Sequence, residues 1–140
     1  MATLDMKDVV LGQYVGNPNG EGKSKIGYLE ETGVKKGSTT ASFALVALHI
    51  NNDRWKGVPF FIRAGKALNE SRVEVRVQFK EVANDIFGGQ SKRNMTIFRV
   101  QPNEAIYQRI NIKKPGMGFS LEPTELDLTY STRFHVCANV

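Results

Sequence analysis

Arginine, tyrosine and carboxylate side chains recur two residues apart in the second half of this 140-residue chain, where they could bind a charged ligand. Arg76 alternates with valines, Tyr107 stands two residues before Arg109, and Asp127 stands two before Thr129. Residues at this spacing point to the same face of an extended strand. Arginine forks bind phosphate through paired hydrogen bonds, and an aromatic ring can stack on a base or a nicotinamide. If the strands are neighbours, the pattern predicts a patch for a phosphate-bearing nucleotide.

A second interpretation of the same pattern stays open. A solvated sheet face with internal salt bridges would show the same alternation of charged residues. Arg99 shares a side with Met95 and Ile97, so the alternation alone does not place it on the patch.

Charge and composition restrict the classes of protein to consider. The formal net charge is +5, which favours anionic ligands, and 41% of the residues are apolar, which excludes a collagenous or strongly disordered chain. A chain of this length is one domain or part of one. The longest apolar run, residues 43–48, is far short of the about 20 residues that cross a membrane, so we expect no membrane partner.

Motifs for other chemistries are absent or incomplete. Residues 22–24 (GKS) resemble the end of a phosphate-binding P-loop, but Asn17 stands where that motif needs glycine. Two histidines and one cysteine, His49, His135 and Cys137, are too few and too separated for a metal site or a nucleophile–base pair. A single cysteine and a first segment without a secretory signal predict a reducing, cytoplasmic location.

The elements that must position the patch are mostly strands. The short connections between these strands favour an antiparallel meander, in which one face of the sheet packs on a core and the other face is polar. We expect a hairpin turn at Pro102-Asn103-Glu104 and a long turn-rich loop over residues 12–40. The expected strands are 58–63, 73–79, 95–100, 105–112 and 125–130, with a strand or short helix at 42–50 and a short helix at 81–87.

Four segments, in order, resemble one enzyme family. VVLGQY (9–14), RWKGVPFFIRAGKALNE (54–70), RVQPNE (99–104) and ELDLTY (125–130) are similar to the C-terminal domain of the eukaryotic glucose-6-phosphate dehydrogenase family. The resemblance implies an α+β fold with a large, mostly antiparallel β-sheet and few helices, here incomplete. It divides the chain into an N-terminal extension (1–7), a partial C-terminal domain (8–134) and a divergent tail (135–140).

The resemblance also implies functional residues and partners. The family oxidises glucose 6-phosphate to 6-phosphoglucono-1,5-lactone, reduces NADP, and forms homodimers or tetramers. Lys66 matches a lysine that contacts the sugar phosphate, and Gln101 matches a substrate-side position. Eukaryotic members hold a second, structural NADP, and the matching positions here are Arg63, Arg72, Arg76, Arg99, Tyr107, Arg109, Asp127 and Thr129.

Departures from the family pattern shape the expected function. Ser71 stands where the family commonly has arginine, and Arg72 replaces a common lysine. The coenzyme-binding Rossmann domain and the catalytic histidine have no counterpart in these 140 residues, so we expect no catalytic residue here and no turnover by the chain alone. The alternative is a non-catalytic module that binds NADP or assembles subunits. A nucleic-acid partner is not expected, because no row of aromatic residues stands among the cations.

Overall fold

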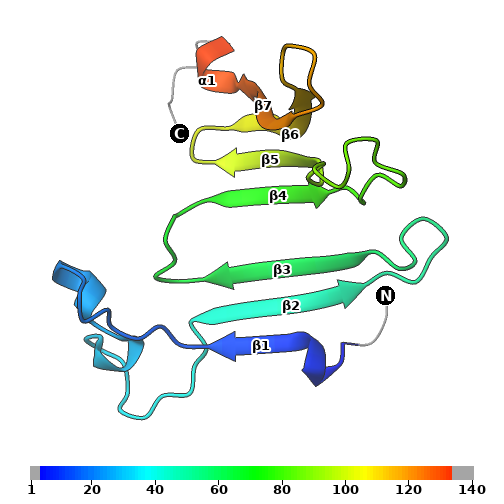
Figure 1. Ribbon diagram of the computed structural model, residues 1–140. Coiled ribbons are helices and arrows are strands. Elements are labelled where there is room, and N and C mark those ends of the chain that lie inside the picture. Colours follow the sequence, from blue (N-terminus) through cyan, green and yellow to red (C-terminus); the bar gives the residue numbers. More distant parts are fainter. Residues whose placement is uncertain (1–3, 134–140) are drawn as a thin grey trace. The chain divides into compact units, whose positions relative to one another are not determined.

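The computed structural model describes residues 4–133, so predictions about the tail, with His135 and Cys137, lie outside the described residues. The chain divides into two compact units, Met1–Asn69 and Glu70–Val140, which are described separately (Figure 1). All strand pairs in the described residues are antiparallel, and helices are few and short. The predicted class, mostly antiparallel β with few helices, is therefore confirmed.

The first unit is built around a three-stranded sheet in the order β1-β2-β3. Its strands are β1 (Val9–Gly12), β2 (Phe43–His49) and β3 (Pro59–Gly65), and its 3₁₀ turns are η1 (Met6–Asp8), η2 (Gly22–Lys25) and η3 (Tyr28–Glu30). The apolar run at 42–50 is thus a strand, and it pairs on both sides as the central one. A strand with apolar residues on both faces has no period-2 pattern, which is why the sequence of this segment does not distinguish a strand from a short helix.

The long loop between β1 and β2 is held by close backbone contacts. A Cβ atom at Gly16 would lie 2.0 Å from the carbonyl oxygen of Lys25, so only glycine fits there. Nearby, the rings of Tyr14 and Tyr28 meet edge to face at 5.9 Å, and the Tyr14 hydroxyl donates to Glu31 at 2.9 Å. Glycine and these few contacts order a segment that contains only 3₁₀ turns.

The second unit is a four-stranded antiparallel sheet in the order β4-β5-β6-β7. Its strands are β4 (Val73–Gln78), β5 (Met95–Gln101), β6 (Ala105–Lys113) and β7 (Leu121–Thr129), followed by the short helix α1 (Tyr130–Arg133). The predicted strands and the β5–β6 hairpin are confirmed. β7 begins four residues earlier than predicted, because Pro123 is tolerated on an edge strand, and Tyr130 begins α1 instead of ending the strand.

The prediction of a short helix at 81–87 is wrong. The Asp85 carboxylate accepts hydrogen bonds from the backbone N–H groups of Phe87, Gly89 and Ser91 at 2.9, 3.1 and 3.2 Å. Asn84 has a φ of 59°, which lies outside the helical region. An aspartate that takes up three backbone donors stabilises a loop in place of a helix.

The core of the second unit also differs from the prediction. The buried cluster is Ile97, Ala105 and Tyr107, and it lies on the charged side of the sheet, not on the side that holds the alternating valines. Val75 and Val77 on the opposite side are 56% and 43% exposed. Long arginine stems can cover apolar neighbours while their charged ends stay in water, which explains a core under a polar face.

No helix among residues 4–133 is long and apolar enough to span a membrane.

Candidate anion-binding site

The strand register of the second unit brings Arg76, Arg99 and Arg109 to one face. Arg76 pairs in register with Ile97, Ile97 with Tyr107, and Tyr107 with Asp127. Two residues further along each strand, Glu74 pairs with Arg99, so this pair lies next to the first set on the same face. Residues in register on antiparallel strands share a face. This register places Arg99, which alternation alone did not assign, beside Arg76 and Tyr107.

A single carboxylate, Glu74, connects the arginines. Its Oε2 accepts from both Nε and Nη2 of Arg76, at 2.9 and 2.8 Å. Its Oε1 accepts from Arg99 Nε at 3.2 Å and lies 3.5 Å from Nη1 of Arg72. Arg72 also pairs with the exposed Glu70. We call Arg72, Glu74, Arg76, Arg99 and Tyr107 the arginine cluster.

Burial separates the carboxylate from the guanidinium groups. The Glu74 side chain is 5% exposed, whereas those of Arg76 and Arg99 are 43% and 28% exposed. Burial raises the pKa of Glu74, but hydrogen bonds from Arg76 and Arg99 and the charges of Arg76 and Arg72 outweigh it. The net result is a pKa below the ordinary value of 4.5, so the carboxylate is ionised at neutral pH.

Tyr107 is part of the cluster through its hydroxyl group. Arg99 Nη2 donates to the hydroxyl oxygen at 3.0 Å, and the guanidinium carbon lies 5.4 Å from the ring centroid. The tyrosine is only 8% exposed. Little of the ring is therefore open to a base, so this arrangement supports the predicted phosphate contacts and not the predicted stacking.

Three other predicted residues lie on the same face but make their own contacts. Arg109 Nε donates to Glu125 at 2.6 Å, and both side chains are about half exposed, at 54% and 51%. Thr129 Oγ1 donates to the carboxylate of Asp127 at 2.8 and 2.9 Å. They flank the arginine cluster, since Asp127 pairs in register with Tyr107.

The remaining predicted residues are Arg63, Lys66 and Gln101. Arg63 lies on β3 of the first unit, and Lys66 follows that strand with an exposed side chain and its N–H bonded to Ser42. Gln101 ends β5 in the second unit and is exposed. The substrate-side candidates Lys66 and Gln101 thus belong to different units.

Glu74 is the functional candidate that the sequence analysis missed. In the sequence it stands as one polar residue of an alternating strand, between Val73 and Val75. A usable signal existed, because an acidic residue with arginine two positions away on each side, at Arg72 and Arg76, is expected to face or adjoin both cations.

The geometry suits an anionic ligand with phosphate groups. Three guanidinium groups lie against the carboxylates of Glu70 and Glu74, and each guanidinium has five N–H donors, of which Glu74 uses at most two. The Asp127 carboxylate beside the cluster can accept from hydroxyl or amide donors. No group of three or more metal-ligating side chains occurs within residues 4–133.

Comparison with known proteins places the chain in one family. The family described as "Glucose-6-phosphate dehydrogenase, C-terminal domain" matches residues 1–139. Glucose-6-phosphate 1-dehydrogenase of Takifugu rubripes is 60% identical over 129 residues, which cover 92% of this chain and 24% of that protein. The Caenorhabditis elegans protein of the same name is 54% identical over 133 residues, covering 94% of this chain and 26% of the relative.

Solved structures give the same result. A glucose-6-phosphate dehydrogenase in complex with its substrate glucose 6-phosphate aligns with a TM-score of 0.84 and 44% identity, over 96% of this chain and 27% of that one. The Mycobacterium avium glucose-6-phosphate 1-dehydrogenase aligns with a TM-score of 0.72 and 31% identity, over 91% and 26%. The chain spans about a quarter of the length of these proteins.

Proposed function

The chain belongs to the glucose-6-phosphate dehydrogenase family, as part of its C-terminal domain, and from this premise we propose that its arginine cluster binds the phosphates of NADP. The observation that carries the proposal is the cluster itself, in which Arg72, Arg76 and Arg99 converge around one buried carboxylate. Guanidinium forks match phosphate oxygens, and a 2′-phosphate would favour them over neutral partners. The role is non-catalytic, as a structural cofactor site.

We further propose that the protein to which this segment contributes oxidises glucose 6-phosphate to 6-phosphoglucono-1,5-lactone and reduces NADP. Lys66 and Gln101 would contact the sugar phosphate, since an ammonium offers a point charge and an amide offers both donor and acceptor. The 140 residues alone would not catalyse this oxidation, because no base for the C1 hydroxyl of the sugar can be assigned among them. Glucose 6-phosphate and NADP added to the purified chain should give no NADPH absorbance, and turnover above background would contradict this.

Calorimetry on the purified chain tests the cofactor site. NADP should bind more tightly than NAD, and Arg76→Gln should weaken NADP binding by about tenfold or more, the factor for losing a charged hydrogen-bond pair. Arg93→Gln is the matched control. Arg93 forms the same kind of fork with Glu81, at 2.9 and 2.8 Å, outside the cluster. Equal affinity for NADP and NAD, or an equal loss in the control, would remove the cofactor proposal.

A second candidate function, subunit assembly, has its own observation. The side of β4–β7 opposite the arginine cluster carries half-exposed apolar residues, among them Val75, Phe98 and Leu126 at 56%, 40% and 55%. Exposed apolar rows of this kind mark interaction surfaces. We propose that a second copy of the chain covers them. Sedimentation should show a dimer that Val75→Glu dissociates, while Val15→Glu, at an 85% exposed loop position, leaves it intact. A monomer at all concentrations would reject this function.

A further inference from the structure

Glu74 occupies an unusual position for a carboxylate at a site that should attract anions. It lies at the start of β4, next to an irregularity in the register between Val73 and Glu74. Its side chain is 5% exposed, whereas that of Arg76 is 43% exposed, so solvent reaches the guanidinium group more readily than the carboxylate. A buried carboxylate among arginines can be a mere counter-charge or a support that fixes the guanidinium planes.

The hydrogen bonds favour the supporting role. Both donors on one edge of the Arg76 guanidinium converge on Oε2, which fixes the plane of that group. On Oε1, Arg99 donates through Nε at 3.2 Å and the Tyr107 hydroxyl lies at 3.4 Å. Arg99 is then held a second time by its bond to Tyr107 at 3.0 Å. Arg76 uses two of its five N–H donors in these contacts, and Arg99 uses its Nε–H and one Nη2–H, so N–H groups of both remain for a ligand.

From this geometry we propose that Glu74 is a positioning residue, which holds Arg76 and Arg99 in the orientation that receives the 2′-phosphate of NADP. The inference rests on the proposed NADP site and adds a residue to it. Glu74 would not touch the ligand. It would reduce the conformational freedom that two long side chains lose on binding, and so raise affinity although its charge opposes the anion.

The two roles predict opposite results for Glu74→Gln. The substitution removes one negative charge and keeps the size of the side chain. If Glu74 is only a counter-charge, then its neutralisation makes the site more positive and strengthens phosphate binding. If Glu74 positions the arginines, then binding weakens because their orientation is lost.

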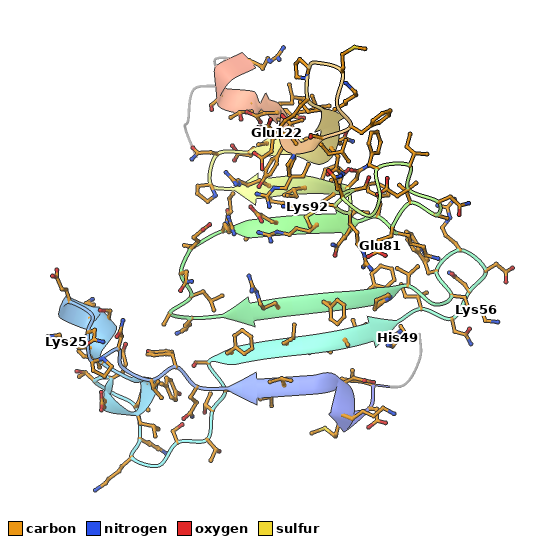
Figure 2. The ribbon with its side chains drawn as sticks, in the orientation of Figure 1. Lys25, His49, Lys56, Glu81, Lys92 and Glu122 are labelled. Carbon is orange, nitrogen blue, oxygen red and sulfur yellow. The ribbon has the colours of Figure 1, made fainter. Side chains whose placement is uncertain are left out.

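The experiment compares the wild-type chain with Glu74→Gln, Glu74→Asp and the control Glu81→Gln. Glu81, labelled in Figure 2, makes the same kind of fork with Arg93 on the surface of the same unit. Affinities for NADP and for NAD are measured by calorimetry. Nuclear magnetic resonance follows the exchange of the Nε–H protons of Arg76 and Arg99, and circular dichroism confirms that each variant is folded.

We expect Glu74→Gln to weaken NADP binding by about tenfold or more, as for the loss of a hydrogen bond to a charged group. NAD binding should change less, so the preference for NADP falls. The Nε–H protons of Arg76 and Arg99 should exchange faster, Glu74→Asp should recover part of the affinity, and Glu81→Gln should match wild type. A folded Glu74→Gln chain that binds NADP equally or more tightly would overturn the proposal, and so would an equal loss for NADP and NAD.

The exchange measurement separates failure of this inference from failure of the proposed function. If the wild-type chain does not prefer NADP over NAD, then the cofactor proposal fails. The exchange rates still decide the role of Glu74, because unchanged Nε–H exchange in Glu74→Gln would show that the carboxylate does not order the arginines.

Discussion

Arg99 and Tyr107 contact each other diagonally across the β5–β6 hairpin, with Nη2 of the arginine 3.0 Å from the tyrosine hydroxyl and its guanidinium over the ring. The contact joins the charged cluster to the small core beneath it, because Tyr107 also belongs to that core. The hydrogen bonds of Arg99 to Glu74 and to Tyr107 raise the pKa of Arg99 above its ordinary value, so its charge is permanent in solution.

Tyr107→Phe tests this contact. The ring and its packing remain, but the hydroxyl that accepts from Arg99 is lost, so we expect the free energy of unfolding to fall by about 1 kcal/mol. Urea unfolding followed by circular dichroism measures it. Tyr14→Phe is the control, since it removes an exposed hydroxyl bonded to Glu31 in the other unit. If Tyr107→Phe has the stability of wild type, the Arg99 contact contributes nothing to the fold.

Ile97→Ala tests the position of the core. Ile97 is 0% exposed and lies between Arg76 and Tyr107 in the strand register. Removing its side chain leaves a cavity, which costs roughly 2–5 kcal/mol for a buried isoleucine. Ile112, which is 42% exposed, gives the matched control Ile112→Ala, for which we expect a smaller loss. Equal effects of the two substitutions would mean that the charged face does not hold the core.

Strand periodicity predicted most of the fold and part of the candidate site. Val73, Val75 and Val77 marked β4, and the spacing of Tyr107 and Arg109 placed both on one face of β6. The side of the sheet that holds the core could not be predicted, since the sequence of one strand does not show which neighbour covers it. Alternation alone does not place Arg99 on this face, which follows only from the cross-strand register.

The loop between β4 and β5 shows a second limit. Residues 81–87 contain helix-compatible residues followed by two glycines, and the sequence carries no sign that Asp85 takes three backbone donors. Glu81 and Lys92, labelled in Figure 2, lie in this loop, three residues after the end of β4 and three residues before the start of β5. A local preference for helix was overridden by side-chain to backbone hydrogen bonds, which depend on the three-dimensional path of the loop.

Asp85→Ala tests this interpretation of the loop. Loss of the carboxylate leaves the N–H groups of Phe87, Gly89 and Ser91 without that partner, so we expect their amide hydrogen exchange to accelerate and stability to fall by about 1 kcal/mol. Asp53→Ala, in the exposed loop between β2 and β3, is the control. Unchanged exchange at all three amides would show that the carboxylate does not order the loop.

Glu74 should make stability depend on pH in the acid range. Its pKa in the folded chain lies below the ordinary value of 4.5, so its contribution is complete above pH 4.5 and is lost as pH falls through the folded-state value. Wild type should therefore lose stability more steeply below pH 4.5 than Glu74→Gln, which has no carboxylate to protonate. Urea midpoints measured from pH 7 to pH 3 give the two slopes. Parallel curves would mean that the arginines do not stabilise the charged form of Glu74.

Gly16→Ala tests whether the long loop of the first unit depends on close backbone contact. An added Cβ would lie 2.0 Å from the Lys25 carbonyl oxygen and 2.7 Å from its carbon, so the two segments must move apart. Overpacking of this kind costs typically about 1–3 kcal/mol. Gly12→Ala is the matched control, because a Cβ there meets no atom within 4 Å. We expect faster amide exchange at Asn17, whose N–H donates to Ser24 at 2.8 Å, in the Gly16 variant alone. A similar change in both variants would show that the approach of Gly16 to Lys25 does not hold the loop.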